Sequence, residues 1–159
     1  MMGDDAVLSI ASRAVRRAAD LFTHDKPSDL AFNPNGDMTK LAGPAVAQAF
    51  QYFTGMHAFL ACELGKLDAE QTVQEFQVKI VKQRIILGSA DSKSKKYNID
   101  AHISLDEEHL RLSKNLLEKT AYRAALEATV KGLENKAACL SRELTRREYE
   151  SRLNQRSGG

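Results

Sequence analysis

One long segment near the C-terminus constrains the fold of this 159-residue chain more than any other feature. From Ser104 to about Leu153 the sequence contains no proline, and Gly132 is the only glycine. An uninterrupted helix of that length would extend roughly 75 Å at about 1.5 Å per residue, which is too long to lie within a compact globule of this size. We therefore expect a long helix that needs a partner helix along its length.

An apolar repeat within the segment indicates what kind of partner this is. Its members step alternately by four and three residues, which is the repeat of a left-handed coiled coil. The seam comprises Leu126, Val130, Leu133, Ala137, Leu140 and Leu144, and its backward extension includes Leu116 and Leu112. We expect these residues to form the core of a coiled coil and to contribute to oligomer contacts.

Two basic residues interrupt that extension. Lys119 and Arg123 fall where the repeat expects apolar side chains, so the stripe is expected to shift to its neighbours. These neighbours are Leu117, Ala121, Ala124 and Ala128. The widened apolar face predicts two partners, one a helix of the same chain and the other a second subunit.

Start and stop signals place the other helices. Ser104 and Glu107 have the spacing of a capping box, which predicts that the long helix begins there. Upstream, a helix is expected from Pro44 to Leu64, with Val46, Ala49 or Phe50, Phe53, Met56 or His57, and Leu60 on its apolar side. Asp68 then resembles an N-cap, with Gln71 three residues on, for a helix that continues to Gly88. Whether residues 44–88 form one kinked helix or two stays open.

The helix that ends at Gly88 has its own apolar repeat, made of Val73, Phe76, Ile80 and Leu87. Residues 89–103 read as an irregular connector with a possible short extended piece. Folding back through this connector would produce an antiparallel helical hairpin.

The N-terminal part is expected to form a smaller element. Asp4 or Asp5 can cap an amphipathic helix over residues 6–22. Its apolar stripe comprises Val7, Ile10 or Ala11, Ala14, Ala18 and Leu21. Residues 24–43 are rich in turn formers and predict a linker. The resulting organisation is a helix at 1–23, a linker at 24–43, a hairpin domain at 44–154 and a flexible tail at 155–159.

Composition supports an all-α fold. The chain is 43% hydrophobic but has no tryptophan and only 6% aromatic residues, which disfavours a β-sandwich or barrel. A net charge of +2 restricts any electrostatic function to local patches. The acidic N-terminus and the lack of a membrane-spanning run predict a cytoplasmic protein with no membrane partner. Cys62 and Cys139 are expected to be buried free thiols.

Catalytic motifs are missing from the sequence. There is no glycine-rich phosphate loop, nucleophile elbow or zinc-type arrangement of His and Cys. His109 lies near Asp106 and Glu107, but a capped helix start explains those carboxylates. We expect neither enzymatic activity, nor a cofactor, nor a metal site.

Two basic regions and one aromatic cluster are candidates for nucleic-acid contact. The first region comprises Lys79, Lys82, Arg84, Lys93, Lys95 and Lys96, with Tyr97 beside it to stack on an unpaired base. The second comprises Arg142, Arg146 and Arg156 as unpaired cations that clamp a phosphate backbone. The aromatic cluster, a possible stacking platform, comprises Phe50, Tyr52, Phe53 and Phe59.

Each candidate has a structural alternative. The lysines can belong to a solvated hairpin tip. The C-terminal arginines can belong to a salt-bridged helix end, in which Glu143 pairs with Arg147 and Glu148 with Arg152. The aromatic residues can be packed core.

The succession from a helix with Phe76, Lys79, Lys82 and Arg84, through a lysine-rich connector, to a long helix with the Arg146-Arg147 pair resembles UvsY-type phage recombination mediators. The resemblance covers roughly residues 66–150. It implies a non-enzymatic homo-oligomer that binds single-stranded DNA and helps a RecA-type recombinase displace single-strand-binding protein. It also implies that the lysines around residues 79–96 contact DNA.

Two other functions fit the same residues. The chain can be a structural or scaffolding protein of a virion or other assembly, whose long helix packs only against sister subunits. It can also be an adaptor that docks its N-terminal helix on another protein.

Overall fold

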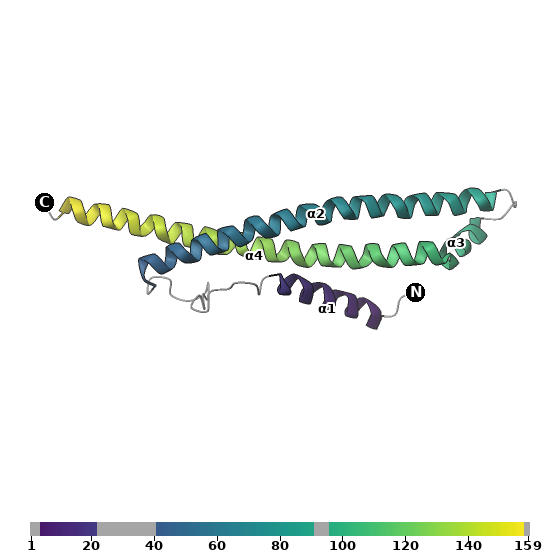
Figure 1. The fold of residues 1–159 in the computed structure, drawn as a ribbon, viewed down its shortest axis with the longest axis horizontal. Helices are drawn as coiled ribbons and strands as arrows, with labels where there is room; N and C mark the ends of the chain where they lie inside the picture. Colours follow the sequence, from purple (N-terminus) through teal and green to yellow (C-terminus); the bar gives the residue numbers. More distant parts are fainter. Residues whose placement is uncertain (1–3, 22–40, 91–95, 158–159) are drawn as a thin grey trace. The chain divides into compact units, whose positions relative to one another are not determined.

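The computed structural model describes residues 4–21, 41–90 and 96–157. These residues form α1 (Asp4–Asp20), α2 (Gly43–Ala90), α3 (Lys96–Leu105) and α4 (Glu107–Ser157), shown in Figure 1. No strand occurs in these three ranges. The all-α prediction is confirmed, while the predicted linker lies mostly outside the described residues.

The chain divides into two compact units, and α2 and α4 contribute to both. The first unit contains Met1–Arg17 and Glu63–Ala125, and the second contains Ala18–Cys62 and Leu126–Gly159. In the first unit, three ion pairs join α2 to α4: Asp68–Arg123, Glu70–Lys119 and Arg84–Glu108. Partner numbers on α4 fall as those on α2 rise, so the two helices are antiparallel. The predicted antiparallel hairpin is confirmed.

The second unit has an apolar seam between α2 and α4. Val46, Phe53 and Leu60 are spaced by seven residues along α2, and each is at most 2% exposed. Their partners on α4 are Leu126, Leu133 and Leu140, which share that spacing and are equally buried. Such a repeat is that of a left-handed coiled coil, and full burial of each large side chain contributes roughly 1.5–3 kcal/mol. Val130, Ala137 and Leu144 are half-buried beside them, so the predicted seam is packed within the chain, and its predicted oligomer contacts stay a prediction.

The first unit continues the same register with polar side chains. On α2 the next buried positions are Gln74 and Val81, which are 8% and 5% exposed. On α4, Lys119 and Arg123 keep their places in the repeat and are half-buried, as are Leu112 and Leu116. The expected shift of the stripe is therefore wrong, because carboxylates of α2 neutralise the two cations within the seam.

Most residues of the expected shifted stripe are exposed. Leu117 is 39% exposed, Ala124 and Ala128 are exposed as well, and Ala121 is half-buried. The apolar repeat in the second half of α2, made of Val73, Phe76, Ile80 and Leu87, is exposed at all four positions. The buried residues of this stretch are Gln74 and Val81, so it is their side of α2 that packs within the first unit.

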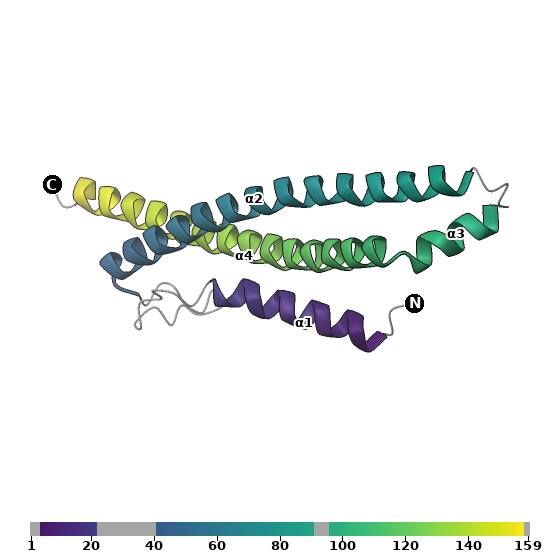
Figure 2. The same cartoon turned by 45° about the vertical axis from the view of Figure 1, so that its right-hand side comes forward.

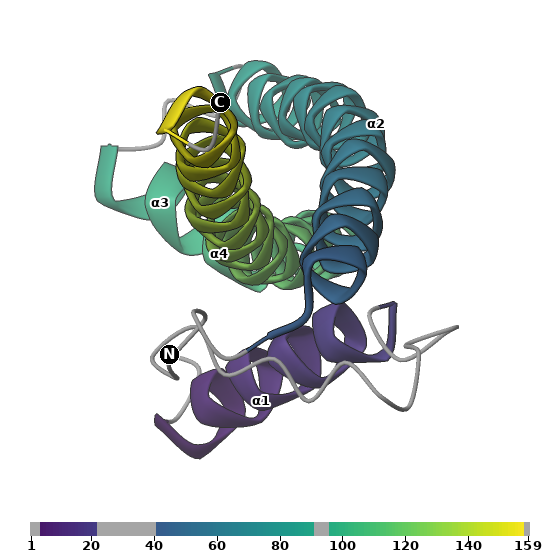
Figure 3. The ribbon, with the colours of Figure 1, turned by 90° about the vertical axis from the view of Figure 1, so that its left-hand side faces the viewer.

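α1 packs on the first half of α4 and runs in the same direction, because its contact partners on α4 rise in number along α1. Figure 3 shows the same ribbon turned so that α2 and α4 are seen end-on. Arg13 Nη2 lies 3.2 Å from Glu118 Oε1, and the Arg17 guanidinium lies 4.5 Å from the ring centroid of Tyr122. Ile10 and Ala14 are buried, which confirms the amphipathic stripe within this unit. Two arginines of α1, Arg13 and Arg17, thus contact α4.

α2 is one helix, which settles the question left open by the sequence. Gly65 lies in its interior, and Asp68 is not an N-cap. A helical glycine costs only about 1 kcal/mol relative to alanine, which the seam on both sides outweighs. Asp68 instead uses its carboxylate in the ion pair with Arg123, and its carbonyl accepts a hydrogen bond from Thr72 Oγ1.

The connector contains a helix that the sequence did not predict. Residues from Lys96 to Leu105 form α3, which precedes α4 in Figure 2. Ile103 is 9% exposed and Ile99 is half-buried one turn earlier, so a short apolar stripe stabilises the helix. Ser104 belongs to α3, where its hydroxyl donates to the Asp100 carbonyl at 2.8 Å.

The cap of α4 is Asp106 rather than Ser104. Asp106 Oδ1 accepts a hydrogen bond of 2.7 Å from the backbone N–H of His109. This agrees with the interpretation of the acidic residues as a capped helix start. At its other end α4 reaches Ser157, four residues past the predicted end at Leu153. None of the helices described contains a stretch long and apolar enough to cross a membrane.

Candidate nucleic-acid interface and assembly surfaces

The second half of α2 carries the basic residues of the first candidate region. Lys79, Lys82 and Arg84 are exposed. Arg84 donates through Nη2 to Glu108 of α4, and this hydrogen bond and the attraction of the carboxylate raise the pKa of Arg84. Among the described residues, neither lysine has a carboxylate partner. Lys79 and Lys82 are therefore the cations in this region most available to a phosphate.

The rest of this region is placed only in part. Lys96 and Tyr97 form the start of α3. Lys93 and Lys95 lie outside the described residues. The helical start at Lys96 puts two members of the predicted cluster on a regular element instead of an irregular connector.

The arginines at the end of α4 are largely committed to carboxylates. Arg146 donates through Nε and Nη2 to both oxygens of Glu143, at 2.9 and 2.8 Å, and through Nη1 to Glu150. Arg147 Nε donates to the same Glu143 at 2.6 Å. The prediction of an unpaired Arg146 is therefore wrong, because carboxylates three residues before it and four after it lie on its own face of the helix.

Glu143 is the centre of this network. Its side chain is only 8% exposed, and hydrogen bonds from Arg146 and Arg147 lower its pKa from 4.5 to about 2. The predicted pairs Glu143–Arg147 and Glu148–Arg152 are both present, the latter at 2.5 Å. The salt-bridged helix end thus describes this region, although Arg142 and Arg156 remain exposed.

The aromatic cluster near the start of α2 is mainly core. Phe53 is 2% exposed, Tyr52 contacts it edge-on at 5.3 Å, and Lys136 lies 5.4 Å from its ring centroid. Phe50 is half-buried, and only Phe59 is largely exposed, at 50%. A stacking platform made of all four rings is therefore excluded.

Among the described residues, no group of three or more His, Cys, Asp or Glu side chains has an arrangement that would hold a metal ion. Cys139 is half-buried, but Cys62 is exposed, which corrects the expectation that both thiols are buried. The α2 register explains this, since Leu60 occupies the seam and Cys62 points away from it.

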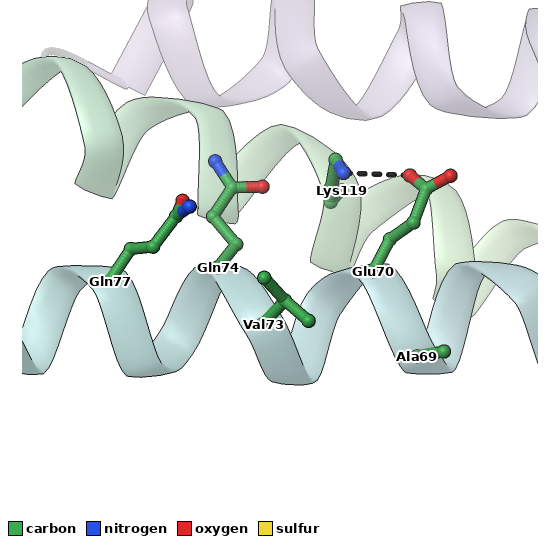
Figure 4. Close-up of a pocket in the computed structure, with 6 residues that line it drawn as sticks. All are labelled: Ala69, Glu70, Val73, Gln74, Gln77 and Lys119. Carbon is green, nitrogen blue, oxygen red and sulfur yellow. Dashed lines mark hydrogen bonds and ion pairs between the residues drawn. The ribbon is translucent and has the colours of Figure 1, made fainter.

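An open hollow of about 400 Å³ lies on the first unit beside the ion pair of Glu70 and Lys119. Figure 4 shows these two side chains reaching toward each other from α2 and α4, with Gln74 directed toward α4. Their Oε2–Nζ distance is 2.7 Å. Ala69 and Val73 complete one side of the hollow, so it borders the exposed apolar residues of α2.

Comparison with known proteins adds no relative, since no family model, curated protein or solved structure matches this chain.

Proposed function

We propose that this chain is a non-enzymatic, self-assembling protein that binds single-stranded DNA and assists homologous recombination as a mediator. The observation that carries DNA binding is the exposure of Lys79 and Lys82 on one flank of α2. They are three residues apart, so their side chains neighbour each other on the helix surface.

Phosphate contact is the chemistry that suits these lysines. Each Lys–phosphate contact releases a condensed counterion, which provides affinity without sequence preference. The adjoining segment at residues 91–96 adds Lys93, Lys95 and Lys96 to the same stretch of sequence. Arg84 is a weaker candidate because it already donates to Glu108.

The recombination role rests on the resemblance to UvsY-type mediators. A RecA-type recombinase and single-strand-binding protein are therefore the proposed protein partners. The helical hairpin is compatible with such a role, because it offers long exposed helix faces in place of a closed pocket.

A second candidate function is structural assembly without DNA. It is favoured by the large apolar side chains left exposed on α2, of which Phe76 is 63% exposed. On this alternative the lysines serve only solubility. The two functions differ in one measurable property, affinity for a polyanion.

Binding to a fluorescent single-stranded oligonucleotide across a salt series tests the proposal. For single strands the slope of log K against log salt is about −0.7 per phosphate contact, so replacing Lys79 and Lys82 by Ala should reduce its magnitude by about 1.4. The matched control replaces the exposed lysines Lys114 and Lys131 by Ala and should leave the slope unchanged.

Absence of binding by the wild-type chain at low salt would remove the mediator proposal and leave structural assembly. Equal slopes for the two double variants would show that Lys79 and Lys82 do not contact DNA.

A further inference from the structure

The outer face of α2 in the first unit carries a second apolar repeat. Val73, Ile80 and Leu87 follow one another at intervals of seven residues, with Phe76 between the first two and Ala69 four residues before Val73. The four large side chains are 48–71% exposed. We call these five residues the outer seam. From Ala69 to Ile80 its steps of four, three and four residues are those of a coiled-coil contact, and the one polar position of the repeat is the exposed Gln83 before Leu87.

The outer seam is distinct from the contact inside the hairpin. Gln74 and Val81 occupy the inner positions of the same stretch of α2 and are buried against the rest of the first unit. Both seams have the same seven-residue period, so they stay on different sides of the helix along its length. A chain with two such seams on one helix can pair with two helices, and α4 covers only the inner one.

We propose that the outer seam pairs with the outer seam of a second copy of this chain, in antiparallel orientation. This deepens the self-assembly of the proposed function by naming its surface, and it rests on that function only for the role of assembly in DNA binding. In this register Phe76 lies opposite Ile80 of the second copy, and Ala69 lies opposite Leu87.

Shape favours this arrangement. Ala69 is small and borders the hollow beside Glu70, so there is room for the large Leu87 side chain of the second copy. Leu87 is the most exposed of the four large outer-seam residues, at 71%. The antiparallel register thus places the exposed Leu87 side chain of one copy against the hollow of the other.

Charge also selects the antiparallel orientation. Glu70 and Arg84 flank the outer seam on one side, and Lys79 flanks it on the other. Antiparallel pairing sets Glu70 against Arg84 of the second copy at both ends, and Lys79 against its own counterpart once. Parallel pairing sets Lys79 against Arg84 twice and provides no opposite-charge contact.

The intramolecular ion pairs are compatible with these contacts. Glu70 accepts from Lys119, and Arg84 donates to Glu108, but their side chains remain 60% and 63% exposed. Approach of the second copy would align Lys119, Glu70, Arg84 and Glu108 in a row of alternating sign. Such a network costs less side-chain entropy per contact than separate pairs.

The two copies of Lys79, which meet at the centre of the proposed interface, link self-association to DNA binding. Two like charges at the middle of the interface weaken it at low salt, and a bound phosphate would neutralise them. Single-stranded DNA should therefore strengthen self-association, through a residue that is also a candidate DNA contact.

Measuring the mass of the protein in solution tests whether the outer seam is the self-association surface. The wild-type chain should have at least twice the 17.6 kDa mass of one chain, and Phe76→Asp should have a lower mass at the same concentration, with an unchanged helical circular dichroism spectrum. Its matched control is Leu117→Asp, at an exposed leucine in the third turn of α4, which should keep the wild-type mass.

A monomeric wild-type chain would overturn the inference, as would equal masses for wild type and Phe76→Asp. A loss of mass in Leu117→Asp alone would assign the interface to the outer face of α4. Complex formation only with another protein would show that the outer seam serves a different partner.

Cysteine cross-linking tests the orientation and does not require a disruptive variant. In a chain with Cys62→Ser and Cys139→Ala, Lys79→Cys should form a disulfide-linked dimer on oxidation, because it lies near the two-fold axis. Leu87→Cys should not, since antiparallel pairing separates the two copies of residue 87. Efficient linkage through Leu87→Cys but not Lys79→Cys would overturn the antiparallel arrangement.

The failures of the two proposals are distinguishable. A wild-type oligomer that ignores DNA removes the mediator proposal and keeps the interface. A wild-type monomer that binds DNA removes the interface and keeps DNA binding.

Discussion

The two units use the same helices in opposite ways. In the second unit the inner seam is apolar, with Phe53 and Leu60 of α2 fully packed, while the exposed outer positions hold Gln48, Gly55 and Cys62 and only one large apolar residue, Phe59. In the first unit the inner seam holds Gln74 and ion-paired cations, while the outer positions hold large apolar residues. The second unit therefore concentrates its apolar burial inside the chain, and the first unit leaves much of it available to a partner.

This difference predicts where stability resides. Buried leucines contribute by transfer from water and by filling space, whereas partly exposed ion pairs contribute only about 0–1 kcal/mol each. Half-buried pairs such as Asp68–Arg123 fix the register of α2 on α4 but add little to the free energy of unfolding. The apolar seam of the second unit should therefore contribute more to the free energy of unfolding than the polar seam of the first unit.

The largest expected effect is from Leu126→Ala, which removes a fully buried side chain from the apolar seam. Deletion of a buried leucine side chain costs roughly 2–5 kcal/mol. Leu112→Ala, at a half-buried seam position of the first unit, should cost clearly less. Urea unfolding followed by circular dichroism measures both. Equal losses would show that the two seams contribute alike.

The sequence predicts most of the fold because the fold depends on period. Leu126, Leu133 and Leu140 reveal the seam from their spacing alone, and the absence of proline in α4 reveals its length. What spacing cannot reveal is a partner far along the chain. Lys119 and Arg123 look like errors in the repeat until Glu70 and Asp68, about fifty residues earlier, supply their carboxylates.

The candidate site was less predictable, for two different physical reasons. The ion pairs of Arg146 could have been predicted from the sequence. Glu143 and Glu150 lie three residues before it and four after it, so all three side chains share one face of the helix. The exposure of Phe76 and Ile80 could not be predicted from the spacing of the apolar residues. When a helix has two apolar stripes, its sequence does not indicate which of them packs against another helix of the same chain.

A smaller effect is expected from converting the polar seam to an apolar one. The double substitution Asp68→Ala with Arg123→Leu replaces an ion pair, whose side chains are 47% and 35% exposed, by a partly buried leucine. Half-burial of leucine contributes about 1 kcal/mol, and the lost pair about 0–1 kcal/mol. The free energy of unfolding should therefore stay constant or rise by up to about 1 kcal/mol.

Arg123→Ala alone is the control for this double variant, and it should destabilise the chain because it leaves Asp68 without this cation. If the double variant lost more stability than Arg123→Ala, the ion pair would be a main source of stability, and the contrast between the units would fail.

The smallest effect is a pH dependence that differs between the units. Glu143 in the second unit has its pKa lowered to about 2 by Arg146 and Arg147, and Glu70 in the first unit has its pKa lowered by Lys119. A lowered folded-state pKa provides stability above the unfolded value, here 4.5, and this stability disappears as the pH falls toward about 2. Wild-type unfolding midpoints should therefore fall more steeply over that window than those of Glu143→Gln.

The matched comparison is Glu70→Gln, whose carboxylate is more exposed and has one cation instead of two. Water screens this pair more effectively, so its removal should flatten the acid dependence less than Glu143→Gln does. Urea midpoints at several values between pH 4.5 and about 2 measure both slopes. A larger change for Glu70→Gln would mean that the first unit, with its polar seam, depends more on its charges than the second unit depends on the Glu143 network.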